Sequence, residues 1–465
     1  MREETTRLGL DRPAQRVFWA AVAIRLAFAV VVPISEGLSG GRYVEPARCF
    51  LAGRFLDPQT VMQLPGAPLV FAACGVHFAL IGLVQQLMGL TCLYLLMRLA
   101  QEAFAHGATA GALIAGQLVI PYQERFLLSE TVGQFFLVCA LWAAYRLHKD
   151  WNAGARHWLW AGALPAFAGL TRGEFFFLGP VLALALWLGR PKLSGSGSRV
   201  FLYAAPWALL YAGWLGHNSL AGFNGFNAHG PTVLLDTARS MVRYDLPTQP
   251  LVKKVFREQL ARCGGCGSGQ CPGCSGDDRA TTIGRLQTEF GMPPLQAYAA
   301  VGSMAREAAF SRPLRFLPLV LDSFRKYLIP SAWMKETPEL RAVLALGPLQ
   351  RAFFRGIQLG PQYLGWIPML LCWLTPWVLR RADSEERWTA WLMLAAVLST
   401  AGTASVFRTT GRTQAALYLP LGVLAALTVK TFGPAWRRRA QRVSGGLWAP
   451  SSSQKVRTSA APSGS

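Results

Sequence analysis

Residues 17–34 read "VFWAAVAIRLAFAVVVPI", an apolar run interrupted only by Arg25. A helix of roughly 20 such residues spans the hydrocarbon core of a bilayer. The chain is 52% hydrophobic and 15% charged, whereas soluble domains contain about 25% charged residues. Similar apolar windows recur at residues 80–99, 107–121, 131–145, 158–170, 175–188, 200–215, 359–379, 388–406 and 415–432. The sequence therefore predicts an all-α polytopic membrane protein.

The stretch before the first window is "RLGLDRPAQR", and no small-residue cleavage site follows the window. A cleavable signal peptide needs such a site after a short apolar core. We therefore expect the first window to be retained as a transmembrane helix.

The basic residues are distributed unevenly along the chain. The formal charge is +22, and Arg and Lys gather at residues 2–16, 146–156, 190–199 and 380–387 and in the tail "RRRAQR". Every second loop is therefore basic, as cytoplasmic loops are. This pattern predicts ten membrane spans, with both termini in the cytoplasm. Topology and contact with anionic headgroups account for the charge, so nucleic-acid binding is not favoured.

This topology divides the chain into five segments, the second of which contains an outer loop at 35–66. The segments are a cytoplasmic N-terminus (1–13), an N-terminal transmembrane module (14–216), a long extracytoplasmic loop (217–358), C-terminal transmembrane helices (359–432) and a basic cytoplasmic tail (433–465). The composition of the tail is typical of disorder. The long loop has apolar residues at helical spacing, for example in "PLRFLPLVLDSFRKYL". It is predicted to form a helical insert on the membrane surface.

Three short loops on the predicted outer side carry ionisable residues at the membrane rim, where such residues usually mark function. An arginine there can hold a lipid phosphate through two parallel hydrogen bonds. A carboxylate can act as a general base or bind a divalent metal. The candidate carboxylates are Glu36, Glu45 and Glu130, and the candidate lipid-phosphate ligands are Arg42, Tyr43, Arg125 and Arg172.

Several of these charged residues also have a purely structural interpretation. Arg172 and Glu130 could simply pair with each other between helices. Arg25 could be a buried structural cation with a carboxylate partner. Glu124 and Arg125 could be solvated at the surface.

Four stretches resemble a known family in their order along the chain. They are "RYVEPARCFLAGRF" (42–55), "QLPGAPLVFAACG" (63–75), "RFLLSETVGQFFLV" (125–138) and "GLTRGEFFFLGP" (169–180). This order is similar to that of bacterial GT-C glycosyltransferases of the dolichyl-phosphate-mannose mannosyltransferase and aminoarabinose-transferase type. The resemblance implies a GT-C-like bundle of about 10–12 transmembrane helices with a helical extracytoplasmic insert. It also implies a place in a bacterial inner membrane and transfer of a sugar from a polyprenyl-phosphate donor to an extracytoplasmic glycolipid, polysaccharide or protein.

The resemblance assigns roles to individual residues. Glu130 resembles the acid of the family's Ser-Glu motif, Arg172 the phosphate contact of its Thr-Arg turn, and Tyr43 its loop tyrosine. His217 stands where some members place a metal-coordinating histidine, although a lone histidine is more often structural.

The first loop departs from the family pattern, in which an aspartate shortly precedes the tyrosine. Residues 38–41 here read "LSGG". Glu36 or Glu45 could replace that acid, because glycines let the loop fold back, and Glu36 is favoured. Alternatively, the protein binds the lipid without transferring sugar. A lipid or sugar transporter is a further alternative, although transporters usually show internal repeats and charges near the bilayer midplane.

The long loop contains a cysteine cluster, "CGGCGSGQCPGC", formed by Cys263, Cys266, Cys271 and Cys274. Two CxxC pairs at this spacing could bind one structural zinc ion. On the oxidising side of a bacterial membrane they could instead form disulfides. Both alternatives stay open, as does a divalent metal at the active site.

Overall fold

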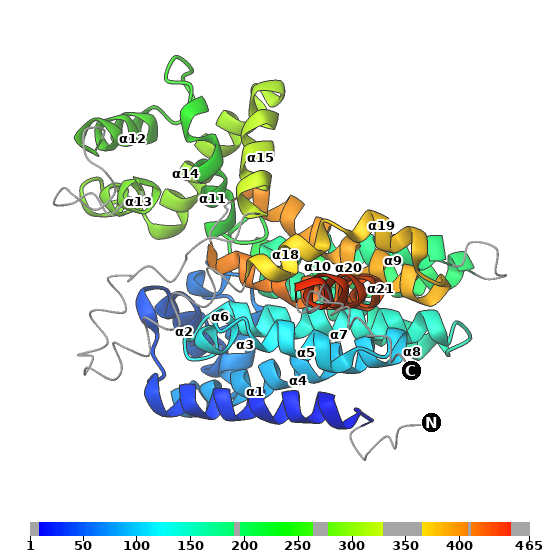
Figure 1. The fold of residues 1–465 in the computed structure, drawn as a ribbon. Coiled ribbons are helices and arrows are strands. Elements are labelled where there is room, and N and C mark those ends of the chain that lie inside the picture. The colour runs from blue at the N-terminus through cyan, green and yellow to red at the C-terminus, as the bar shows by residue number, and fades with distance from the viewer. Residues whose placement is uncertain (1–8, 190–195, 264–277, 329–364, 408–410, 448–465) are drawn as a thin grey trace, which may run out of the picture.

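The computed structural model describes residues 9–189, 196–263, 278–328, 365–407 and 411–447. Within these ranges the chain is helical without named strands, which confirms the predicted all-α class. Long helices run side by side in a bundle (Figure 1). The bundle contains α1 (Arg12–Val31), α4 (Phe78–Phe104), α5 (Gly107–Ala115), α7 (Ser129–Lys149), α8 (Ala155–Thr171), α9 (Leu178–Gly189), α10 (Ser196–Leu220), α18 (Trp366–Cys372), α19 (Thr375–Arg381), α20 (Ser384–Phe407) and α21 (Gly411–Leu447).

Large aromatic side chains and close helix contacts form the core of the bundle. Trp158, Tyr145 and Tyr203 are fully buried there. Gly162 of α8 lies so near α10 that a Cβ atom at this position would overlap the carbonyl oxygen of Tyr203. Small residues let helices approach closely in membranes, where the apolar lipid gives no hydrophobic drive for helix association. Packing between α8 and α10 therefore depends on this glycine.

Four helical segments in the described part of the chain are long and apolar enough to cross a membrane by length and composition. They are Arg12–Val31, Phe78–Phe104, Ser384–Val406 and Ala415–Trp436. The predicted window 107–121 is divided between α5 and α6 (Val119–Gln123), and the window 359–379 contains the short α18. The polytopic membrane class is confirmed, and the count of ten spans stays a prediction.

The predicted outer loop 35–66 is largely helical, although its glycines suggested a loop without regular structure. It contains α2 (Gly37–Leu51) and the 3-10 turn η1 (Pro58–Val61), and α3 (Gly66–Ala73) begins where it ends. Val44 and Ala47, three residues apart on α2, are fully buried in a small apolar cluster with Phe71 of α3 and Val132 of α7. This apolar face of α2 explains why the segment folds against the bundle as a helix.

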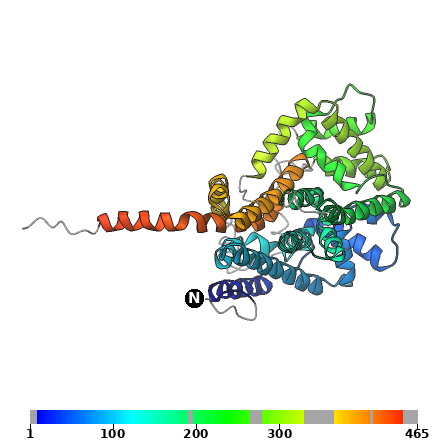
Figure 2. The ribbon, with the colours of Figure 1, turned by 90° about the vertical axis from the view of Figure 1, so that its right-hand side faces the viewer.

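A separate helical insert follows α10. It consists of α11 (His229–Ala238), the 3-10 turn η3 (Arg239–Met241), α12 (Pro250–Cys263), α13 (Asp278–Thr288), α14 (Pro294–Phe310) and α15 (Pro313–Tyr327). These helices enclose an apolar cluster of their own, which includes Leu235, Phe256 and Val301. Both views show the insert as a distinct lobe beside the bundle (Figures 1 and 2). Helix α10 continues past residue 217 to Leu220, and the predicted division of the chain into five segments stays a prediction.

Candidate active site

Arg172 lies at the centre of a buried group of polar side chains. Its Nη1 atom is 3.0 Å from Oε1 of Glu130 and donates to Oγ of Ser129 at 3.2 Å. Its Nε and Nη2 atoms donate to the two carboxylate oxygens of Glu174 at 2.6 and 3.1 Å. The side chains of Arg172, Glu130 and Glu174 are only 9%, 2% and 10% exposed. Solvent therefore screens these ion pairs weakly.

Two helix ends position this group. Helix α7 begins at Ser129, so Glu130 lies in its first turn, where the helix dipole favours a carboxylate. Helix α8 ends at Thr171, and the 3-10 turn η2 (Gly173–Phe175) then folds Glu174 back onto Arg172. Gly133, one turn further along α7, leaves room for the Arg172 side chain, since a Cβ there would lie 2.9 Å from its Cδ atom.

Tyr43 joins the first outer segment to this group. Oγ of Ser129 donates to the hydroxyl oxygen of Tyr43 at 3.0 Å, so one serine hydroxyl connects Tyr43 with Arg172. Three residues predicted from three separate loops, Tyr43, Glu130 and Arg172, are thus gathered in one place. The pairing of Arg172 with Glu130, which the sequence left open, is observed.

Backbone contacts hold the outer segments together. Ser35 accepts a hydrogen bond from the N–H of Leu127 at 3.0 Å, and its own N–H donates to the carbonyl of Arg125 at 3.1 Å. Gly66, at the start of α3, packs against Thr171 so closely that a Cβ atom would overlap the threonine side chain. The segment before α2 is therefore joined to the segment before α7, and the start of α3 packs against the end of α8, next to Arg172.

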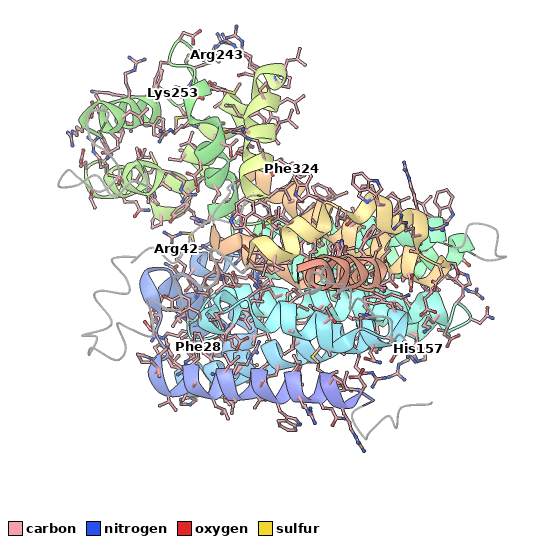
Figure 3. All side chains as sticks on the ribbon, viewed as in Figure 1. Phe28, Arg42, His157, Arg243, Lys253 and Phe324 are labelled. Carbon is pink, nitrogen blue, oxygen red and sulfur yellow. The ribbon has the colours of Figure 1, made fainter. Side chains whose placement is uncertain are left out.

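The other candidates from the first outer segment have different neighbours. Glu36 is the half-buried residue that precedes α2. Glu45 is 53% exposed and pairs with Arg48. Arg42 lies on the insert side of α2 (Figure 3), and its Nη1 atom is 3.3 Å from Nε2 of His229. Among the described residues, the hydrogen-bond and ion-pair partners of Arg172 are Ser129, Glu130 and Glu174, so Glu36 and Glu45 are outside the group.

Glu124 and Arg125 are buried, so their interpretation as solvated surface residues is wrong. Nε and Nη2 of Arg25 donate to the carboxylate of Glu124 at 2.9 to 3.1 Å, which confirms Arg25 as a buried structural cation with a carboxylate partner. Arg125 donates to the carbonyls of Val32 and Ala29 at 2.7 and 3.2 Å. Its guanidinium thus satisfies carbonyls at the end of α1 that have no partner within the helix. Its predicted lipid-phosphate contact stays a prediction.

His217 has the surroundings of a structural histidine. Its Nε2 atom lies 2.7 Å from the carbonyl oxygen of Phe55, its Nδ1 atom lies 3.1 Å from Oδ1 of Asn218, and its ring stacks on Trp214. It therefore ties α10 to the first outer segment. In the described ranges, no three His, Cys, Asp or Glu side chains gather as metal ligands. The divalent metal and the role of His217 as a ligand stay predictions.

The zinc and disulfide alternatives concern residues at and beyond the end of α12. Cys263 is the last residue of that helix, and Cys266, Cys271 and Cys274 lie outside the described residues.

The charges of the Arg172 group determine what it can do chemically. Burial disfavours the charged guanidinium, and the two neighbouring carboxylates favour it. One guanidinium faces two carboxylates, so the group has an excess of negative charge that suits proton acceptance. All three guanidinium nitrogens contact protein oxygens. A lipid phosphate could therefore reach Arg172 by replacing a carboxylate, and Glu174 occupies the bidentate Nε–Nη2 edge that a phosphate would use.

Two partners in this group were not among the predicted site residues. Glu174 stands two positions after Arg172, so its place in the same turn was a usable signal. Ser129 bridges to Tyr43 across 86 positions of sequence. The Ser-Glu motif drew attention to the helix start, but no local pattern indicated which hydroxyl the serine would contact.

Comparisons with known proteins support the predicted resemblance for part of the chain. Residues 67–213 match the family model described as dolichyl-phosphate-mannose-protein mannosyltransferase. This segment includes Glu130 and Arg172, and the match confirms the resemblance to GT-C membrane glycosyltransferases over these residues. No curated protein matches the sequence.

The solved structures that show a remote similarity to the chain include those of two different proteins. ArnT from Cupriavidus metallidurans, in a crystal structure bound to undecaprenyl phosphate, gives a TM-score of 0.32 at 14% identity, with 92% of this chain and 80% of that chain covered. The oligosaccharyltransferase of Archaeoglobus fulgidus, tethered with an acceptor peptide, gives a TM-score of 0.30 at 12% identity. The alignment covers 82% of this chain and 58% of that chain.

Proposed function

We propose that this protein is a membrane glycosyltransferase of a bacterial inner membrane that moves a sugar from a polyprenyl-phosphate donor to an extracytoplasmic acceptor. The observation that supports the proposal most is the convergence of Tyr43, Glu130 and Arg172 from three segments, two of which lie in the region that matches the family model. Ionisable side chains that a membrane protein buries within its bundle usually mark function.

Glu130 is the carboxylate to which we assign the proton transfer. Its carboxylate accepts the proton of the acceptor hydroxyl, whose oxygen forms the new bond to the anomeric carbon of the sugar. The bond between that carbon and the donor phosphate oxygen breaks, and the polyprenyl phosphate leaves with the bonding electrons. Arg172 and Ser129 hold Glu130 and Tyr43 in fixed positions around this reaction.

Glu174 controls the access of the donor phosphate to Arg172 in this proposal. It occupies two guanidinium nitrogens at 2.6 and 3.1 Å, and its negative charge repels a phosphate. A Glu174→Gln variant keeps the size of the side chain but removes that charge. We expect its apparent KM for the lipid donor to fall, because the phosphate competes with a neutral amide for the same edge of Arg172.

The test is a profile of lipid-linked sugars in membranes of a strain that lacks the gene. The strain is complemented with wild type, Glu130→Gln, Glu36→Gln or Glu45→Gln, and the amount of each variant in the membrane is matched. We expect a polyprenyl-phosphate sugar to accumulate in the uncomplemented strain and in the Glu130→Gln strain. Wild type and the Glu45→Gln control, whose exposed side chain pairs with Arg48, should prevent the accumulation.

The Glu36→Gln strain decides whether Glu36 replaces the aspartate of the family pattern. Accumulation in that strain but not with Glu130→Gln would move the proton transfer to Glu36. An unchanged lipid profile in every strain would refute the transferase and favour a protein that binds the lipid without transferring sugar.

A further inference from the structure

Helix α15 carries a row of apolar side chains that face away from the protein. Leu314, Leu317 and Leu321 are 85%, 53% and 58% exposed, and Phe310, at the end of the preceding α14, is 62% exposed. Their spacing of three and four residues places the leucines on one side of the helix. The opposite side packs into the protein, since Phe316 is buried in the core of the insert.

This row differs from ordinary surface exposure of apolar residues. Single exposed leucines are common on soluble proteins and need no explanation. A continuous row at helical spacing costs free energy in water, and such patches mark surfaces that meet a partner or a membrane. In the part of the insert that the structure describes, α15 is the helix with several such residues on one side.

The position of α15 indicates which partner covers the row. Its end packs on the bundle: Tyr327 is fully buried in the bundle core, and Phe324 lies where the insert meets the bundle (Figure 3). Helix α15 contacts α20, whose segment Ser384–Val406 is long and apolar enough to span a membrane. Leu398 of α20 is itself 54% exposed. Figure 1 shows α15 running across the direction of the bundle helices, as a helix in the plane of a membrane does.

Basic residues flank the apolar row. Arg315 and Arg325 are both exposed, and Arg325 also pairs with Asp322 of the same helix at 2.9 Å. Long basic side chains can extend from an apolar surface to the phosphates of lipid headgroups while their methylene groups stay in the apolar region. Exposed arginines beside a leucine row therefore match an anionic lipid surface in charge and in shape.

We propose that α15 is an interfacial helix whose leucine row is inserted into the bilayer leaflet on the side of the insert, with Arg315 and Arg325 at the lipid phosphates. The helix thereby fixes the insert against the membrane next to α20. This proposal does not depend on the proposed transferase activity.

The test uses the full chain reconstituted in vesicles of phosphatidylcholine and phosphatidylglycerol. A photoreactive azidophenylalanine replaces Leu317 in one variant. In the matched control it replaces Lys254, an exposed residue of α12, the helix on the other side of the insert from α15 (Figure 1). After illumination, mass spectrometry identifies what each position has captured. We expect lipid adducts at Leu317 in severalfold higher yield than at Lys254.

Other captured products would overturn the proposal. Adducts at Leu317 to residues 329–364 of the same chain would show that this segment covers the row. Adducts to a second copy of the chain would show an interface between copies. Equal lipid yields at the two positions would show that the row has no preferred contact with the bilayer. A second variant with Leu314→Ser and Leu321→Ser should lower the lipid yield at Leu317, and an unchanged yield there would also contradict the proposal.

Discussion

Arg25 and Glu124 form a second buried ion pair in the described part of the bundle, apart from the Arg172 group. The side chains are 6% and 0% exposed, and the arginine binds both carboxylate oxygens. The pair is close to Gly89 of α4, where a Cβ atom would overlap the Glu124 carboxylate. Removal of one partner from such a pair leaves an uncompensated buried charge and costs about 3–5 kcal/mol. Replacement of both partners by apolar residues is often nearly neutral.

We therefore predict that Arg25→Met strongly lowers the thermal unfolding midpoint in detergent, and that the double variant Arg25→Met, Glu124→Leu recovers most of the loss. Arg48→Met is the control, because the pair of Arg48 with Glu45 is exposed and contributes little. If the double variant were as unstable as Arg25→Met, the pair would have a role beyond mutual neutralisation.

At the scale of elements, α8 and α10 show how small residues set the geometry around the site. Gly162 lets the two helices approach until its Cα faces the backbone of Tyr203. The same α8 ends one residue before Arg172, so its position determines where the guanidinium lies. Gly169 near the end of α8 makes a similar contact with the Tyr211 hydroxyl. The packing of α8 against α10 thus determines where the end of α8, and with it Arg172, lies.

Gly162→Ala should destabilise the protein by about 1–3 kcal/mol, the usual cost of overpacking. The added methyl group would meet the carbonyl oxygen of Tyr203, which belongs to the backbone and cannot rotate away. Gly213→Ala on α10 is the matched control, since nothing lies near its added Cβ. Alanine should stabilise a helix there by roughly 0.5–1 kcal/mol. Thermal unfolding of both variants in the same detergent measures the difference, and equal midpoints would contradict close α8–α10 packing.

For the whole molecule, the bundle places the outer segments that carry the candidate site residues and the basic turn between α7 and α8 at opposite ends. The segments around α2, α3 and α6 lie at one end of the bundle, and the turn between α7 and α8, next to His157, lies at the other (Figures 1 and 3). Arg146 and Lys149 precede that turn. The positive-inside pattern predicts that this turn is cytoplasmic and that the opposite end of the bundle is extracytoplasmic.

Cysteine labelling in intact cells tests this topology. Asn152 lies in the turn between α7 and α8, Asn224 follows α10, and both are exposed. A membrane-impermeant maleimide should modify Asn224→Cys in intact cells and Asn152→Cys only after permeabilisation. Mass spectrometry of the two peptides separates them from the native cysteines. Labelling of Asn152→Cys in intact cells would reverse the predicted orientation of the N-terminal module.

The sequence by itself determined the class of this protein, because apolar windows near the length of a bilayer span allow few structures other than helices. It also indicated Tyr43, Glu130 and Arg172, since each lies in a short local motif. Tertiary structure alone decided which residues far apart in the sequence meet. Ser129 meets Tyr43 across 86 positions and Arg25 meets Glu124 across 99. Such pairs depend on how helices cross, and helix crossing follows from the packing of many side chains rather than from local spacing.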